Sequence, residues 1–160
     1  MNEIVKLKIG LDYHGVITDN IYYFKYFSAS LKQRGHQLHI ITGGPFSIVE
    51  KQLKKDGIIY SDIFTIYDYY KSKNQVTYHA DGSFKIEDEL WNKAKAEYCQ
   101  RKGIHIHIDD SIIYRQYFLT PYCLYDKTTK SCSSTPQKQK LDLYSLPPTQ
   151  TIMQLERMFS

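Results

Sequence analysis

The stretch "KIGLDYHGVITDN", residues 8–20, decides the fold. An apolar run ends in Asp12, and Tyr13, His14 and Gly15 follow directly. The apolar pattern predicts a strand that enters a core, and Gly15 permits a sharp turn after it. In open α/β sheets ligands bind at the carboxyl ends of strands, so the carboxylate of Asp12 is predicted to stand at such an end.

The rest of the chain alternates helical and strand patterns. We expect helices over residues 20–34, 46–57 and 88–103, strands over 36–44, 63–70, 104–109 and 121–126, and a hairpin over 74–87 around Asp81-Gly82. This order predicts an α/β fold, with a mostly parallel sheet of about five strands flanked by helices and a small β-hairpin insertion.

Three segments are predicted along the chain. Residues 1–126 form the α/β core with its hairpin insertion, and residues 127–140 are polar and rich in Ser, Thr and Lys, which is typical of a loop or linker. Residues 141–160 contain a short helix on which Ile152, Leu155 and Phe159 share one face. We expect this face to dock on the core.

Composition sets the broad class of the protein. The 160 residues are 42% hydrophobic and 24% charged, as in an ordinary one-domain globular protein. Apolar runs fall short of the roughly 20 residues that a membrane span needs, and the first residues lack a signal-peptide pattern, so we expect a cytoplasmic protein without membrane contact. The net charge of +4 is too mild for a dedicated nucleic-acid binder.

The cysteines and histidines carry little functional signal. Cys99, Cys123 and Cys132 are odd in number and scattered, which predicts thiols rather than a disulfide framework. The four histidines that lie in or beside the strands at 36–44 and 104–109 are expected to serve packing or the surface: His36, His39, His105 and His107.

Chemistry-bearing side chains follow the predicted strands. Asp12, Thr42 and the pair Asp109-Asp110 should lie on one rim, because parallel strands end at the same edge. Converging carboxylates need a compensating cation, and oxygen ligands suit Mg²⁺. Thr42 and the backbone of Gly43 offer donors to an anionic oxygen. The set is typical of phosphoryl transfer.

A lysine of the helix at 88–103 could reach the same rim. Lys93 and Lys95 are the candidates. They are two positions apart on a helix and therefore point in different directions, so only one should face the site.

These patterns resemble those of the haloacid-dehalogenase-like (HAD) phosphohydrolases over residues 4 to about 126. The family's first motif, D-x-D-G-[TV]-[LI], is similar to "LDYHGVITDN", and its second, a strand that ends in Ser or Thr, to "LHIITGG". Its motif lysine corresponds to one within "WNKAKAEYC", and its acidic pair to the end of "IHIHIDDS". The phospho-acceptor receiver domains use similar residues but place the acidic pair first, which argues against them.

The resemblance implies a HAD-like Rossmannoid fold, a Mg²⁺ site and the roles of its residues. Asp12 would be the nucleophile that forms an aspartyl-phosphate and would also bind Mg²⁺. The backbone carbonyl of His14 would be a second ligand, and Asp109 or Asp110 a third, with Asp110 favoured for direct contact.

Three more positions would bind the phosphoryl group. Thr42 would donate a hydrogen bond to it, with Gly43 beside it. Lys95 would hold the nucleophile and the phosphate together, and Lys93 is the alternative for that role.

His14 is the departure from the family pattern, because the family carries an acid/base Asp there. One hypothesis is that the imidazole takes over as general acid/base, since it titrates near neutrality. The other is that acid/base function is lost, which leaves an impaired enzyme or a phosphate-ligand binding or regulatory protein.

The spacing of the motifs leaves no room for a cap domain. About 30 residues separate Asp12 from Thr42 and about 50 separate Thr42 from Lys95, so at most a small flap is present. The resemblance implies an open site for a small phosphorylated substrate, which a homo-oligomer partner could cover. Nucleic-acid end processing is a weaker alternative. The candidate flap residues, each more readily explained as surface packing, are Tyr69, Tyr70, Lys71, Lys73, Tyr78, His79 and Trp91.

Overall fold

A computed structural model describes residues 3–160 of the chain, which fold around one central sheet. The elements in order are β1 (Lys8–Leu11), η1 (Ile17–Asp19), α1 (Ile21–Gln33), β2 (Gln37–Thr42), α2 (Phe46–Asp56), β3 (Asp62–Thr65), α3 (Ile66–Ser72), β4 (Thr77–Tyr78), β5 (Phe84–Lys85), α4 (Asp88–Lys102), β6 (Ile106–Asp109), α5 (Ile112–Arg115), β7 (Tyr122–Asp126), β8 (Ser131–Thr135), β9 (Lys140–Asp142) and α6 (Thr149–Met158). None of the helices in this described part combines the length and apolarity that crossing a bilayer requires.

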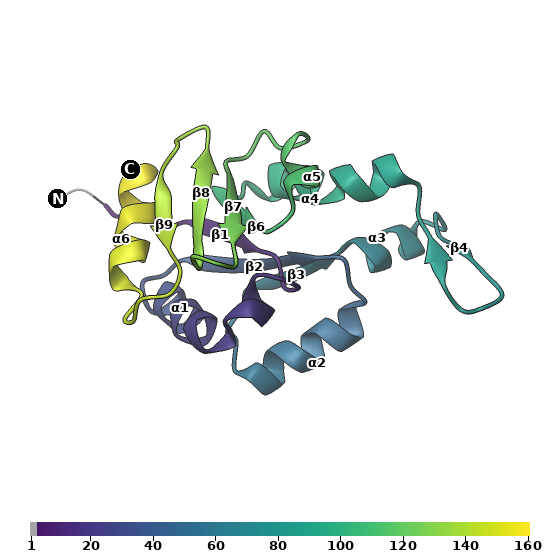
Figure 1. Cartoon of the computed structure of the whole chain (residues 1–160), viewed down its shortest axis with the longest axis horizontal. Coiled ribbons are helices and arrows are strands. Elements are labelled where there is room, and N and C mark those ends of the chain that lie inside the picture. The colour runs from purple at the N-terminus through teal and green to yellow at the C-terminus, as the bar shows by residue number, and fades with distance from the viewer. Residues whose placement is uncertain (1–2) are drawn as a thin grey trace.

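The sheet has seven strands in the order β3-β2-β1-β6-β7-β8-β9. The strands from β3 to β7 are parallel to their neighbours, whereas β8 and β9 are antiparallel additions at one edge. In Figure 1, α1 and α2 lie on one side of the sheet and α4 and α5 on the other. The predicted α/β class with a mostly parallel sheet is confirmed, and the sheet is wider than expected.

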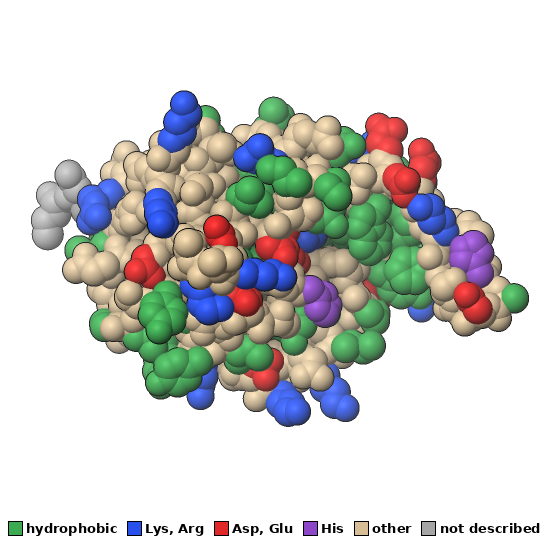
Figure 2. Space-filling model, in the orientation of Figure 1, with side chains coloured by type: hydrophobic (Ala, Val, Ile, Leu, Met, Phe, Trp, Pro, Cys, Tyr) green, Lys and Arg blue, Asp and Glu red, His purple; other side chains and the backbone are tan. Residues whose placement is uncertain are grey.

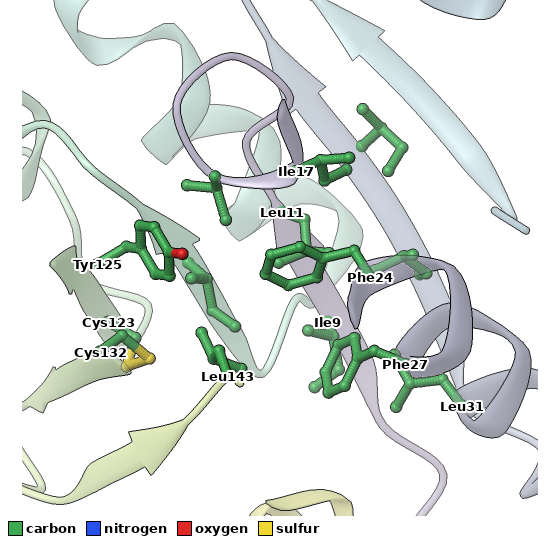
Figure 3. Packing of buried hydrophobic residues seen from close by; sticks show 14 of the residues in the cluster. Ile9, Leu11, Ile17, Phe24, Phe27, Leu31, Cys123, Tyr125, Cys132 and Leu143 are labelled. Atoms are coloured by element: carbon green, nitrogen blue, oxygen red, sulfur yellow. A yellow bond between two sulfur atoms is a disulfide. The ribbon is translucent and has the colours of Figure 1, made fainter. Parts of the chain in front are cut away.

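The core lies on both faces of β1 and its neighbours. Ile9 and Leu11 of β1 face Phe24 and Phe27 of α1, and all four side chains are fully buried (Figure 3). A second cluster on the opposite face packs α4 against the sheet. Helix α1 begins where the Asn20 side chain accepts a hydrogen bond from the backbone N–H of Tyr23 at 3.2 Å, a typical N-cap.

The predicted hairpin is present as β4 and β5, with its turn at Asp81-Gly82. The Asp81 carboxylate accepts hydrogen bonds from the backbone N–H of Ser83 at 2.9 Å and from its hydroxyl at 2.6 Å, which fixes the turn. Its two strands form a separate sheet of their own within the described chain, and the hairpin projects as an arm beyond α3 (Figure 1).

The prediction of a strand over residues 63–70 was wrong in its second half. Strand β3 ends at Thr65, and α3 begins at Ile66. Asp68, in the first turn of α3, accepts a hydrogen bond from the Thr65 hydroxyl at 2.6 Å. A short apolar run does not distinguish strand from helix by its pattern, and this acidic residue is the local signal for a helix start.

The prediction of a loop or linker over residues 127–140 was also wrong. Strand β8 occupies Ser131–Thr135, and β9 joins it from Lys140. The C-terminal segment therefore belongs to the same sheet as the core. Helix α6 docks on it as expected, with Ile152 and Leu155 buried.

The expectation of three unpaired thiols was wrong for two of them. Cys123 of β7 and Cys132 of β8 form a disulfide across the antiparallel pair, with their Cα atoms 5.4 Å apart (Figure 3). Cys99 is a buried free thiol. The partner of Cys123 could not be found from sequence, because the strand that carries Cys132 was itself missed.

Candidate active site

The carboxyl ends of the central strands bring the predicted residues to one edge. Asp12 follows β1, and its backbone N–H donates to the carbonyl of Ile108 in β6 at 3.0 Å. Thr42 ends β2 on the other side of β1, and Asp109 ends β6. The shared rim predicted from the strand pattern is therefore present.

Lys95 connects two of the carboxylates. Its Nζ lies 2.7 Å from Oδ2 of Asp109 and 3.2 Å from Oδ1 of Asp12, and the lysine is only 2% exposed. The Nζ of Lys93 lies 3.7 Å from Glu97 on a more exposed side of α4. Of the two candidate lysines, α4 presents Lys95 to the acidic residues.

Asp109 is held by three donors. Lys95 and Nε2 of His107, at 2.9 Å, contact its Oδ2, and the backbone N–H of Ser111 donates to Oδ1 at 3.1 Å. Burial alone would raise the pKa of Asp109, but Lys95 and His107 outweigh it and hold that pKa well below its ordinary value. Asp109 therefore stays ionised and fixed in orientation.

His107 was expected to serve packing or the surface, and its ring does pack, stacked on Phe118 with centroids 5.2 Å apart, but its bond to Asp109 was not predicted. The ring is fully buried, and burial lowers its pKa, so it is neutral near pH 7. A carboxylate only accepts, so Nε2 carries the proton that binds Asp109. The missed signal was spacing: His107 and Asp109 are two residues apart on one strand and so share a face.

A Cβ on Gly10 would lie 2.8 Å from Nδ1 of His107, which explains a glycine in the middle of β1.

Asp12 has the opposite electrostatic balance. Burial raises the pKa of Asp12 most, Lys95 lowers it and the nearby charge of Asp109 raises it, and together they bring this pKa to about 7. Burial lowers the pKa of Lys95, but the two carboxylates dominate and raise it above its ordinary value, so the lysine stays charged. The carboxylate of Asp12 is thus the one whose ionisation depends on added positive charge.

Three carboxylates could hold a metal ion. Ligand atoms of Asp12, Asp109 and Asp110 all lie within 4.8 Å of one another. Asp109 is already occupied by its three donors, whereas the side chain of Asp110 is 26% exposed and, within residues 3–160, forms one ion pair, with Lys127 at 3.5 Å. An all-oxygen donor set of this kind fits Mg²⁺, with Asp12 and Asp110 as the more available ligands.

The loop after β1 packs tightly against Asp110. Gly15 has a φ of +85°, and a Cβ built there would overlap the Asp110 carboxylate. Only glycine meets both requirements, so the sharp turn expected at this position also makes room for a candidate ligand.

The side chain of His14 is exposed at this edge and packs edge-on against the ring of Tyr13, with centroids 4.9 Å apart. Within residues 3–160 its backbone carbonyl accepts no hydrogen bond, so that oxygen is free for a cation. Figure 2 shows acidic, basic and histidine side chains meeting near the middle of this face.

Thr42 and the two glycines after it form the neighbouring part of the edge. The Thr42 hydroxyl is buried, and within the described chain it has no hydrogen-bond partner. Asp68, which sequence reasoning did not single out, steadies the turn: its carboxylate accepts a hydrogen bond from the backbone N–H of Phe46 at 2.7 Å, just beyond Gly44.

Of the predicted flap residues, Trp91 reaches the site. A Cβ on Gly43 would lie 3.1 Å from its ring, and its Nε1 donates to the Tyr114 hydroxyl at 3.2 Å. The Tyr114 ring in turn lies 4.7 Å from Nζ of Lys95. Tyr114 was missed because nothing in the sequence separates it from the chain's other tyrosines.

The other predicted flap residues lie on α3 and on the hairpin arm. Tyr70 is buried and donates to the Leu90 carbonyl at 3.0 Å, as a packing residue does. The Nζ of Lys73 lies 4.6 Å from the Tyr69 ring, that of Lys71 lies 5.7 Å from the Tyr67 ring, and the hydroxyls of Tyr67 and Tyr78 are 2.9 Å apart. The backbone N–H of His79 bonds Ser83 in the hairpin turn. Packing accounts for each of these contacts.

No family model, curated protein or solved structure matches this chain. The site is therefore interpreted from its own geometry and from the motifs in the sequence.

Proposed function

We propose that this protein is a HAD-like, Mg²⁺-dependent phosphohydrolase that cleaves a phosphomonoester through Asp12. The observation that carries the proposal is the contact of one buried lysine, Lys95, with both Asp12 and Asp109 at the carboxyl edge of a parallel sheet. The order of the four sequence motifs supports it as well.

Asp12 would act as the nucleophile. One carboxylate oxygen attacks phosphorus, the bond from phosphorus to the leaving oxygen breaks, and that oxygen leaves with a proton. Water then attacks the aspartyl-phosphate, releases inorganic phosphate and a proton, and restores the carboxylate. Mg²⁺ held by Asp12, Asp110 and the His14 carbonyl would supply positive charge for the phosphoryl oxygens.

Other residues of the chain would position the reacting groups. Lys95 would orient the carboxylate of Asp12 and offer charge to a phosphoryl oxygen. The unpartnered hydroxyl of Thr42 would donate to another such oxygen, which would satisfy its buried group. Asp109 and His107 would act as positioning residues, since they hold Lys95 in place.

His14 would move the proton. Its exposed imidazole belongs to the segment that follows the nucleophile and can donate a proton to the leaving oxygen. The second candidate function rests on the same residue. Within residues 3–160 no side-chain hydrogen bond orients that ring, and an unoriented acid would leave a slow enzyme or a protein that only binds a phosphate ligand.

A panel of sugar phosphates, nucleotides and phosphorylated polymers, assayed with Mg²⁺ and with EDTA, tests the proposal. We expect Asp12→Asn to abolish phosphate release, while the control Asp88→Asn, at a position 82% exposed on α4, leaves it unchanged. No turnover of any member by the folded wild-type protein would contradict hydrolase activity.

Replacement of His14 separates the two functions. If the imidazole is the working acid, His14→Ala lowers kcat by about 10²-fold or more and shifts the pH profile. If the histidine impairs an enzyme of the family type, His14→Asp raises phosphatase activity above that of the wild type.

A further inference from the structure

A groove of about 650 Å³ opens directly beside the acidic pair. Asp110 lines it, together with Ile112 and Arg115 of α5. Lys127, in the turn after β7, lines it as well. The same carboxylate thus belongs to the candidate metal site and to the groove, so the two are continuous.

The floor of the groove continues the row of side chains that begins at Asp109. Asp109 of β6 pairs with Leu124 of β7, and Leu124 pairs with Ser133 of β8. Paired residues project on the same face of a sheet, and neighbouring strands lie about 4.8 Å apart. Ser133 therefore stands roughly 10 Å across the sheet from the acidic residue, on the same face.

Within residues 3–160 this face of the sheet is left partly open, as its exposure pattern shows. Cys123, Tyr125, Cys132 and Ser134, which point to the other face, are all buried, whereas Leu124, Ser133 and Thr135 on the groove face are partly or fully exposed. The exposed Ser133 hydroxyl can bond a hydroxyl group of a ligand, whereas the Thr135 hydroxyl donates to the Tyr122 carbonyl at 3.3 Å and is left to accept.

Two cations line this groove. The guanidinium of Arg115 is exposed, and within the described chain it makes no ion pair. The Nζ of Lys127 lies 3.5 Å from Asp110 and its side chain is 56% exposed, so it is free to turn toward a ligand. Asp126, the other acid of the groove, caps its own turn by accepting from the backbone N–H of Thr128 at 2.8 Å. An arginine fork beside a hydroxylated floor suits a second phosphate.

We propose that this groove binds the leaving group of the substrate, and that the substrate is a phosphomonoester with a second phosphate further along the groove beside Arg115, joined by a hydroxylated spacer. The inference rests on the proposed function for the position of the first phosphate. Two sources share this chemistry, a sugar bisphosphate and the phosphorylated end of an oligonucleotide.

Calorimetry with matched probes tests the groove. One pair is fructose 1,6-bisphosphate and fructose 6-phosphate, and the other is the 5′-phosphorylated dinucleotide pTpT and thymidine 5′-monophosphate. Each probe is titrated in the presence of Mg²⁺ into the full-length Asp12→Asn protein, in which turnover is removed. We expect the doubly phosphorylated probe of one pair to bind about tenfold or more tightly than its partner. Arg115→Gln should abolish that preference, and Arg157→Gln, at an exposed arginine on α6, should retain it.

Ser133→Glu is a second variant that does not depend on the arginine. It places a negative charge on the exposed floor, and we expect it to lower the same preference. If the variants lose a preference that was seen with the sugar pair, the substrate is a small molecule. If they lose one that was seen with the nucleotide pair, the substrate is a nucleic-acid end. The proposal is overturned if neither pair shows a preference, or if both variants leave it unchanged.

Turnover by the wild-type protein separates this inference from the proposed function. Preference without turnover of any probe supports the groove and contradicts the hydrolase. Turnover with equal use of singly and doubly phosphorylated probes supports the hydrolase and contradicts the groove.

Discussion

Replacement of Lys95 by methionine removes the only cation that lies between two buried carboxylates in the described part of the site. Methionine has nearly the length of lysine, so the packing of α4 against the sheet changes little. Asp12 and Asp109, with ligand atoms within 4.8 Å, are left to face one another. Removal of one partner from a buried ion pair costs about 3–5 kcal/mol, so we expect Lys95→Met to lower the free energy of unfolding by that amount at pH 9 without metal.

The loss should shrink at lower pH, because protonation of Asp12 relieves the repulsion. The pKa of Asp12 is about 7 even with Lys95 present, so in the folded protein it lies above its ordinary value of 3.8. Such a group favours the folded state at low pH, and that contribution is lost as the pH rises through the folded pKa. Lys95→Met should raise the pKa of folded Asp12 further. At a pH above that raised pKa, each added pKa unit costs about 1.4 kcal/mol of unfolding free energy, whereas at pH 5.5 it costs nothing because Asp12 is protonated in both folded proteins.

Urea unfolding at pH 5.5 and pH 9, with EDTA and with Mg²⁺, measures both effects. Lys93→Met is the matched control on the same helix; its partner Glu97 is 3.7 Å away and exposed, so the change should cost less than about 1 kcal/mol at either pH. We expect Mg²⁺ to restore part of the stability of Lys95→Met. A loss below about 1 kcal/mol at pH 9, or one that does not depend on pH, would refute the reasoning.

Two further predictions concern stability and metal binding. Glu156 binds Arg34 at 2.6 Å and His36 at 2.8 Å, so Glu156→Gln should lower the unfolding free energy by about 2 kcal/mol at pH 7. The hydrogen bond from Arg34 holds the pKa of Glu156 below its ordinary 4.5, so wild type and variant should converge in urea titrations as the pH falls below that value; a constant difference would contradict this. Gly15→Ala should displace the carboxylate of Asp110 and weaken Mg²⁺ binding about tenfold or more in calorimetry, and unchanged affinity would exclude Asp110 as a ligand.

The central part of the fold was predictable from the sequence because local signals agree there. Gly103 has a φ of +66° and ends α4 where the sequence predicts a stop, after Arg101 and Lys102 in the last turn. The strand that ends at Asp12 and the one that ends at Asp109 share an edge because parallel strands must end together.

The antiparallel edge of the sheet was not predictable in the same way. The sequence of β8, "SCSST", has few large apolar residues because only one of its faces is buried. Its stability depends on partners in β7 and β9 rather than on its own composition. The groove floor could not be inferred without this strand.

The roles of the two lysines and of His107 depended on the orientation of individual side chains, which the order of helices and strands does not determine. Residue spacing shows that Lys93 and Lys95 diverge, but the rotation of α4 about its axis decides which one enters the site. The bond between His107 and Asp109 depends on both side chains lying on one face near the end of β6, which composition does not reveal.

The row formed by Asp109, Leu124 and Ser133 also bears on how such a protein could evolve. The acid that fixes Lys95 lies on β6, whereas the hydroxyl floor lies two strands away on β8, about 10 Å across the sheet. Substitutions at that distance with no shared partners usually act independently. Changes at Ser133 and Thr135 can therefore alter which molecules are accepted while the reacting groups stay in place, so selection can act on substrate range and on chemistry separately.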